Sequence, residues 1–192
     1  MKRLALVALA AGLAVLLPAQ AQEKKNPIVV MDTSMGKVTI ELFEDKAPIT
    51  VKNFLRYVDE KHYDGTLFHR VIADFMIQGG GFDQTFTEKK THERIKNESF
   101  NGLTNTRGTI AMARLPMPDT ATAQFYINVK DNPGLDRANA RDKVGYAVFG
   151  RVTEGMDVVD KIRRVETGER KGHEDVPKAD VVIRSVRRAD KK

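Results

Sequence analysis

FHRVIADFMIQGGG, residues 68–81 of a 192-residue chain, is the most informative stretch for the architecture. Most of it is apolar, as in a strand that is buried on both faces. It nevertheless carries Arg70 and Gln78, and it ends in three glycines. Burying a guanidinium costs free energy unless a partner or a ligand compensates. Taken alone, the stretch leaves two interpretations open: Arg70 leans toward solvent from a partly exposed strand, or it serves a binding site.

Short β-rich runs with turn signals between them surround this stretch. They span residues 28–31, 37–43, 108–113, 124–129, 146–152 and 181–186. After Pro48, apolar residues recur with helical spacing up to Val58, and residues 155–164 form a second, shorter amphipathic segment. Many short strands and only two helices predict a mainly β fold, a closed barrel or a sandwich. We expect one domain over residues 28–189, with a flexible leader at 22–27 and a tail at 190–192.

The N-terminus has the pattern of a secretory signal peptide. Two cations, Lys2 and Arg3, precede an uncharged apolar run over residues 4–17, and small residues occupy Ala19 and Ala21. We expect cleavage after Ala21, a periplasmic location in a Gram-negative cell, and no membrane association after cleavage. The alternative is a retained transmembrane anchor, for which the apolar run is short, since spanning takes roughly 20 residues.

Composition excludes several classes of chemistry. The formal net charge is +6 and the cations are scattered, so we expect no nucleic-acid partner. The chain has no cysteine, and none of its three serines lies in a G-x-S-x-G setting. No phosphate-binding loop occurs, and no helix pattern follows the triple glycine. Metal-ligand spacing is absent among the four histidines, which are His62, His69, His92 and His173. We therefore expect neither a metal nor a cofactor.

One reaction needs little more than an apolar pocket and a hydrogen-bond donor. Rotation about a peptide bond is opposed by a barrier of about 18–20 kcal/mol, and at proline it takes tens to hundreds of seconds without a catalyst. A pocket that grips the proline ring, with a donor over the prolyl nitrogen, favours the twisted, non-conjugated form. Lowering the barrier by about 7 kcal/mol would accelerate rotation roughly 10⁵-fold. Isomerisation of prolyl bonds thus fits the residues that remain.

Four segments in this order resemble the cyclophilin family of peptidyl-prolyl cis–trans isomerases, and most closely its bacterial periplasmic branch. They read FHRVIADFMIQGGGF, NGLTNTRGTIAMAR, AQFYINV and GYAVFGRVTEGMDVVDKI. The resemblance covers nearly the whole chain after the signal peptide. It implies a closed eight-stranded antiparallel β-barrel capped by two α-helices, with the active site in a groove on one outer face.

The resemblance also implies the site residues. Arg70 matches the catalytic arginine that reaches the substrate carbonyl and prolyl nitrogen, and Gln78 matches the glutamine that binds substrate backbone and orients the arginine. Matches to substrate-binding positions are Phe75, Met76, Ala113, Arg114, Gln124, Tyr126, Leu135 and Tyr146. For Phe75, Met76 and Leu135, simple core packing is the alternative interpretation.

The chain departs from the family pattern at several of these positions. Ala73-Asp74 replaces a usual proline and glycine, and Tyr126 replaces a phenylalanine and adds a hydroxyl that needs a partner. Tyr146 stands where many members have histidine, and Arg114, in place of an asparagine, makes the rim more basic. Gly134 lies where other members carry an aromatic residue that contacts cyclosporin. We therefore predict weak cyclosporin binding.

The leading hypothesis is a prolyl isomerase that assists the folding of exported proteins and acts on proline-containing segments of unfolded chains. A proline-segment-binding chaperone with little turnover is the second hypothesis, and a purely structural barrel is the third. The polar loop over residues 83–101 is long enough to form a functional rim. Nothing in the sequence indicates an oligomer, so we expect a monomer.

Overall fold

The structure, a computed structural model, describes residues 25–189. The predicted signal peptide, the first half of the predicted leader and the predicted tail at 190–192 lie outside the described residues. None of the helices within residues 25–189 has both the length and the apolar character needed to cross a bilayer.

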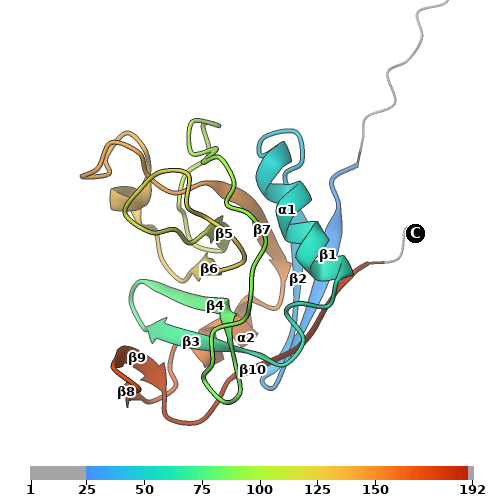
Figure 1. Ribbon diagram of the computed structural model, residues 1–192, viewed down its shortest axis with the longest axis vertical. Helices are drawn as coiled ribbons and strands as arrows, with labels where there is room; N and C mark the ends of the chain where they lie inside the picture. Colours follow the sequence, from blue (N-terminus) through green and yellow to red (C-terminus); the bar gives the residue numbers. More distant parts are fainter. Residues whose placement is uncertain (1–24, 190–192) are drawn as a thin grey trace, which may run out of the picture.

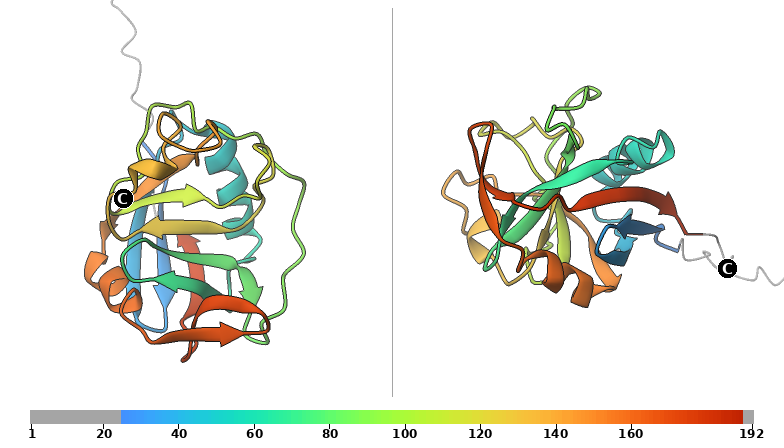
Figure 2. Two further views of the ribbon diagram at one scale, coloured as in Figure 1. Left: turned by 90° about the vertical axis from the view of Figure 1, so that its left-hand side faces the viewer. Right: turned by 90° about the horizontal axis from the view of Figure 1, so that it is seen from below.

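Eight antiparallel strands close into a barrel, which confirms the predicted architecture and decides against the sandwich (Figure 1; Figure 2). The order around the barrel is β1-β10-β3-β4-β6-β5-β7-β2. The bounds are β1 (Ile28–Thr33), β2 (Gly36–Leu42), β3 (Thr66–Ile72), β4 (Met76–Asp83), β5 (Thr109–Met112), β6 (Phe125–Asn128), β7 (Val148–Glu154) and β10 (Val182–Arg188). Residues 68–81 therefore form parts of two paired strands, with a turn at Ala73-Asp74, rather than one continuous strand.

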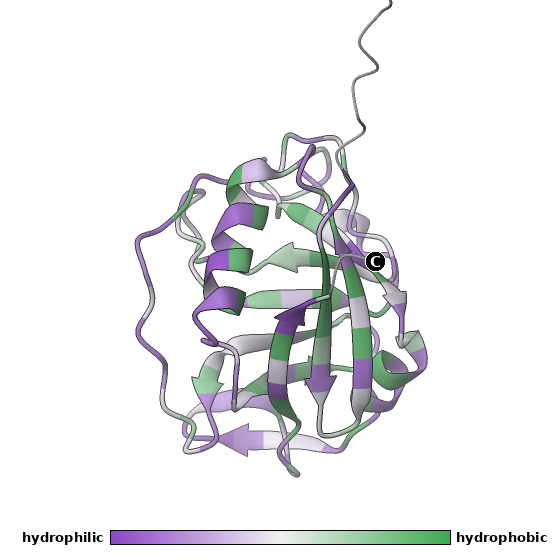
Figure 3. Cartoon of the chain, turned by 90° about the vertical axis from the view of Figure 1, so that its right-hand side faces the viewer, coloured by the Kyte–Doolittle hydropathy of each residue, from purple (hydrophilic) through white to green (hydrophobic). Residues whose placement is uncertain are grey.

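Side chains alternate between the barrel interior and its outer surface, as Figure 3 shows by the bands of opposite hydropathy along the strands. Helices α1 (Pro48–Asp59) and α2 (Met156–Ile162) bury their apolar faces in the same core that fills the barrel. Phe54 of α1 lies 5.7 Å from the Phe125 ring and 5.2 Å from the Phe149 ring, measured between centroids. Both predicted helices are thus confirmed as caps of the barrel.

The long polar loop after β4 completes the first turn of α1. The helix has no side-chain cap from its own N-terminal residue, Ala47. Instead, the carboxylate of Glu98 accepts hydrogen bonds from the backbone N–H of Ile49 at 3.1 Å and of Thr50 at 2.7 Å. A carboxylate at a helix N-terminus satisfies free N–H groups and opposes the helix dipole. Glu98 is 4% exposed, so part of the loop that we expected to form a functional rim is a structural element.

One element was not predicted from the sequence, a hairpin of β8 (Thr167–Arg170) and β9 (His173–Pro177). Its two turn residues have positive φ, 50° at Lys171 and 78° at Gly172, as the tightest hairpin turns require. Val176 of β9 packs with Leu67 of β3 and with Phe86 in a small apolar cluster. The hairpin consequently lies against β3, the strand that carries Arg70 (Figure 2).

Candidate active site

The wall formed by β4, β6, β5 and β7 is apolar on both faces. Ile77, Ile110 and Ile127 face the barrel core. Their sequence neighbours Met76 and Tyr126 belong to a separate cluster together with Ala111 and Val148. Since neighbouring residues of a strand point to opposite faces, this second cluster lies on the outside of the barrel. An apolar outer surface of this kind is where a nonpolar ligand can bind.

Strand register places the predicted catalytic residues in line with this outer cluster. Arg70 on β3 is opposite Gln78 on β4, and Gln78 is opposite Tyr126 on β6. Tyr126 is in turn opposite Ala111 on β5. Directly paired residues in a sheet share a face. The guanidinium, the amide and the apolar surface therefore belong to one continuous outer face of the barrel.

The Arg70 side chain is 45% exposed, and its Nε lies 3.5 Å from Oδ2 of Asp175. The side chain thus leans toward solvent, as one of the two interpretations expects, and it also borders the candidate site. The Gln78 amide donates to Oε1 of Gln124 at 2.8 Å. Because a guanidinium only donates, the Gln78 atom that could accept from Arg70, directly across the strand pair, is Oε1.

The triple glycine makes room for Gln124. A Cβ added to Gly81 would lie 2.5 Å from the Gln124 amide nitrogen, so a larger residue would displace that side chain. Gly80 has a φ of +84°, and a Cβ there would lie 2.8 Å from the Tyr63 ring. The backbone N–H of Ala113 donates to the Gln124 carbonyl at 3.0 Å, which places these two predicted site residues side by side.

Five predicted substrate-binding residues belong to one apolar cluster on the outer face, which we call the depression because it combines two buried residues with three half-buried ones. Met76 and Tyr126 are buried, whereas Phe75, Leu135 and Tyr146 are only half-buried. The Tyr126 and Tyr146 rings meet edge to face at 5.9 Å. Residues of the barrel core are almost fully buried, so the half-buried members favour a pocket over simple core packing. For Met76 both interpretations apply, because it supports the depression from below.

The extra hydroxyl of Tyr126 has the partner that it needs. It donates to Oδ1 of Asn105 at 2.7 Å, and burial raises the pKa of this hydroxyl well above its ordinary value. The backbone N–H of Asn105 donates to Asp136 at 2.6 Å, in the segment just after Leu135. Asn132 links the same loop to the carbonyl of Phe75 at 2.7 Å. A polar network under the depression therefore connects residues on several of its sides.

Arg114 differs from the exposed basic rim residue that the sequence predicts. Its side chain is 2% exposed and forms an ion pair with Asp142. The guanidinium also donates to the carbonyls of Gly145 and Leu115, both at 3.0 Å, and lies 4.5 Å from the centre of the Tyr146 ring. Hydrogen bonding from Arg114 lowers the pKa of Asp142 to about 2. The expectation of a more basic rim at this position is wrong, because the charge is paired and used to join loops.

The turn that lacks the usual proline and glycine is held from outside. Nη1 of Arg163, at the end of α2, donates to the carbonyl of Ala73 at 2.8 Å and lies 3.4 Å from the Asp74 carboxylate. Nε of the same arginine contacts Asp160 at 2.9 Å. These contacts fix the turn that precedes Phe75 without a preset proline φ.

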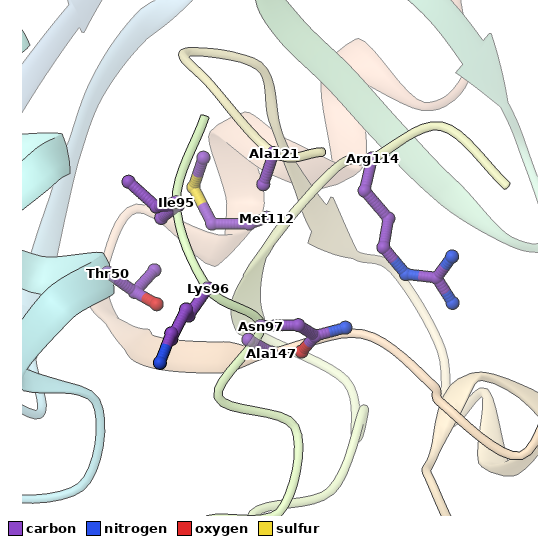
Figure 4. Close-up of a pocket in the computed structure, with 8 residues that line it drawn as sticks. All are labelled: Thr50, Ile95, Lys96, Asn97, Met112, Arg114, Ala121 and Ala147. Atoms are coloured by element: carbon purple, nitrogen blue, oxygen red, sulfur yellow. The ribbon is translucent and has the colours of Figure 1, made fainter. Parts of the chain in front are cut away.

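A small hollow lies beside the depression, between α1, the loop after β4 and the ends of β5 and β7 (Figure 4). Its lining is largely apolar and includes Ile95, Met112 and Ala121. Figure 4 shows that the Arg114 guanidinium points away from these three side chains. The predicted pocket residues Phe75, Met76 and Leu135 do not line it. We therefore place the candidate site in the depression and not in this hollow.

Two further groups lie close to Arg70. His69 is 5% exposed, its Nδ1 has no hydrogen-bond partner among residues 25–189, and burial lowers its pKa to about 4. The imidazole is thus neutral near pH 7. Asp175, in contrast, was missed, because the sequence around it has no clear strand period. Clusters of three or more metal-ligating side chains are absent from residues 25–189.

Comparisons with known proteins agree on one family. The family described as cyclophilin type peptidyl-prolyl cis-trans isomerase/CLD matches residues 28–188. A peptidyl-prolyl cis-trans isomerase of Acinetobacter baylyi is 56% identical over 161 residues, 84% of this chain and 85% of the relative. Isomerase B of Escherichia coli is 56% identical over 160 residues, 83% of this chain and 98% of the relative.

A solved structure has the same fold. The crystal structure of a Cryptosporidium parvum cyclophilin type isomerase in the presence of the dipeptide Ala-Pro superposes with a TM-score of 0.72 at 26% identity. The match covers 85% of this chain and 99% of that one.

The Tyr126 hydroxyl gives a test of the polar network. We expect Tyr126→Phe to lower the free energy of unfolding by about 1–2 kcal/mol, because it removes a buried hydrogen bond and leaves Asn105 short of one donor. Tyr146→Phe is the matched control, since hydrogen bonds to its hydroxyl are absent among the described residues, and it should change stability by less than about 0.5 kcal/mol. Guanidinium denaturation measures both, and equal effects of the two substitutions would contradict the assigned role of the network.

Proposed function

The chain belongs to the cyclophilin-type peptidyl-prolyl cis–trans isomerases, and we propose that it acts outside the cytoplasm on the proline-containing segments of exported proteins. The isomerase activity follows from the family and from relatives that are 56% identical. The periplasmic location and the clients are the parts that we propose. Their support is the signal-peptide pattern before Gln22 together with the open, half-exposed site.

One observation carries the assignment of the reaction to this site. An exposed guanidinium, that of Arg70, shares an outer barrel face with a half-buried apolar depression. In our proposal the depression takes the proline ring, and Arg70 donates to the substrate at the prolyl nitrogen and carbonyl. Gln78 and Gln124, joined at 2.8 Å, offer further groups for the substrate backbone.

The proposed chemistry is electrostatic and conformational. As the peptide bond twists, its nitrogen loses conjugation and becomes a better hydrogen-bond acceptor. A donor that meets this nitrogen only in the twisted state stabilises the transition state more than the ground state. The apolar depression excludes water and strengthens that hydrogen bond. Bond rotation then needs neither proton transfer nor a covalent intermediate.

The substrate class that we propose is proline-containing polypeptide in an extended or unfolded state. The Cryptosporidium relative was crystallised in the presence of Ala-Pro, which is consistent with a site for proline dipeptide units in this fold. The site lies on the outer surface of the barrel and the Arg70 side chain beside it is 45% exposed, so a long chain can reach it. We propose that the protein acts as a monomer and needs neither a metal nor a cofactor.

Arg70→Ala tests the isomerase assignment. We expect kcat/KM for a proline tetrapeptide to fall by about 10²–10³-fold, the usual loss when one transition-state donor is removed. Arg151→Ala is the matched control, because it removes another exposed, ion-paired strand arginine, whose partner is Glu41. It should leave kcat/KM unchanged in a protease-coupled assay. An inactive wild type, or equal protection of an unfolding client by wild type and Arg70→Ala, would instead support the chaperone.

Ala21→Arg tests the proposed export. Signal peptidase requires a small residue before the cleaved bond, so the variant should accumulate as an uncleaved precursor. The wild-type chain should be recovered from the periplasm with Gln22 at its N-terminus, as read by mass spectrometry of fractionated cells. A wild-type chain that stays full-length in the membrane fraction would show a retained anchor.

Weak cyclosporin binding is the third outcome that we expect. Gly134 lies in the short 3-10 helix Pro133–Leu135, and a Cβ added there would meet no atom within 4 Å. That edge of the depression therefore lacks the aromatic wall that we associate with tight binding in the family. Titration calorimetry should give a dissociation constant weaker than micromolar, and a submicromolar value would overturn this expectation. Gly134→Trp should bind more tightly than the wild type.

A further inference from the structure

The unpredicted hairpin brings a carboxylate to the catalytic arginine. Oδ2 of Asp175 on β9 lies 3.5 Å from Nε of Arg70, and the two side chains are 37% and 45% exposed. Gln78, expected to orient the arginine, donates its amide N–H to Gln124, which leaves Oε1 as its one acceptor for Arg70, whereas Asp175 offers a charged acceptor. We propose that Asp175 is a positioning residue that orders Arg70 for catalysis. This inference rests on isomerase activity at the site proposed above.

The hairpin is anchored well enough to position a side chain. Val176, the residue after Asp175, is 3% exposed and packs with Leu67 and Phe86. The Arg170 guanidinium lies 4.8 Å from the centre of the Phe86 ring and donates to Asp180 at 2.6 Å. The amino group of Lys171 donates to the carbonyl of Thr85 at 2.8 Å. Apolar packing and polar contacts thus fix both strands of the hairpin against the barrel.

The backbone at Asp175 is suited to this residue type. Its φ is 59°, in the left-handed region that most side chains avoid and that aspartate and asparagine tolerate best after glycine. A β-branched residue would be strained there. Asparagine and glycine are therefore the substitutions that remove the carboxylate with the least disturbance of the backbone.

Because Asp175 contacts Arg70 at Nε, we expect it to raise the reaction rate rather than to lower it. This contact leaves the two terminal nitrogens of Arg70 available to the substrate, so the carboxylate does not compete for the same donors. An arginine that is ordered in the free enzyme loses less rotamer entropy when the transition state forms. Because both side chains are well exposed, solvent screens the attraction, and the gain is modest, about two- to fivefold in rate.

Asp175→Asn is the primary test. We expect kcat/KM to fall about two- to fivefold, with most of the change in kcat, because the ordered donor matters in the transition state. Glu174→Gln is the matched control, since it removes the same charge from the neighbouring exposed residue of β9 and should change nothing. Raising the salt concentration should bring the wild type toward the Asp175→Asn rate and affect that variant less. A purely structural role of Asp175 would not produce this salt dependence.

A double-mutant cycle separates positioning from other effects. In the Arg70→Ala background, Asp175→Asn should cause no further loss, because the group that it positions is gone. Asp175→Gly gives a second neutral variant, and circular dichroism with thermal unfolding checks that each variant is folded. Folded variants as fast as or faster than the wild type would overturn the inference while leaving the isomerase assignment intact. An inactive wild type would instead overturn the proposed function itself.

Discussion

The alternation of side chains across the wall of β4, β6, β5 and β7 is the constraint on which the site depends. Each strand that sends Ile77, Ile110 or Ile127 into the core must send its neighbours outward. Met76 and Tyr126 are therefore placed outside by the same register that fills the barrel. A shift of one residue in any of these strands would exchange the two faces. Core packing thus fixes the geometry of the outer site.

The parts of the site outside this wall are held by polar contacts from distant segments. Arg163 holds the turn before Phe75 through the carbonyl of Ala73, and Asn105 joins Tyr126 to the loop that carries Leu135. Such contacts compensate for the residues that the family pattern would otherwise use at these positions. The hydroxyl of Tyr126 illustrates this, because a buried hydroxyl without a partner would cost free energy. Where this chain departs from the family pattern, another residue makes the contact that the changed position needs, as Asn105 does for Tyr126 and Arg163 does for the turn at Ala73-Asp74.

The sequence was sufficient for what depends on local periodicity and on matched motifs. The β-rich run over residues 37–43 and the helical spacing after Pro48 predicted a strand and a helix that the structure contains. The sequence did not predict the hairpin of β8 and β9, because its strands are four and five residues long and mostly polar. It did not predict the pairing of Arg114 with Asp142 for another reason. Which charged residues meet depends on how separate loops fold back, and composition does not encode that.

A hydrogen-bond donor in an open site has to be ordered and also has to be accessible to the substrate, and these two requirements oppose each other. Burial would order the arginine but would keep a polypeptide from reaching it, whereas full exposure would leave it disordered. In this barrel the two requirements are met by different elements. The outer wall keeps Arg70 accessible on β3, and the hairpin supplies an ordering contact from the side at Asp175. A hairpin that takes no part in closing this barrel thereby becomes relevant to the order of the arginine that we propose as catalytic.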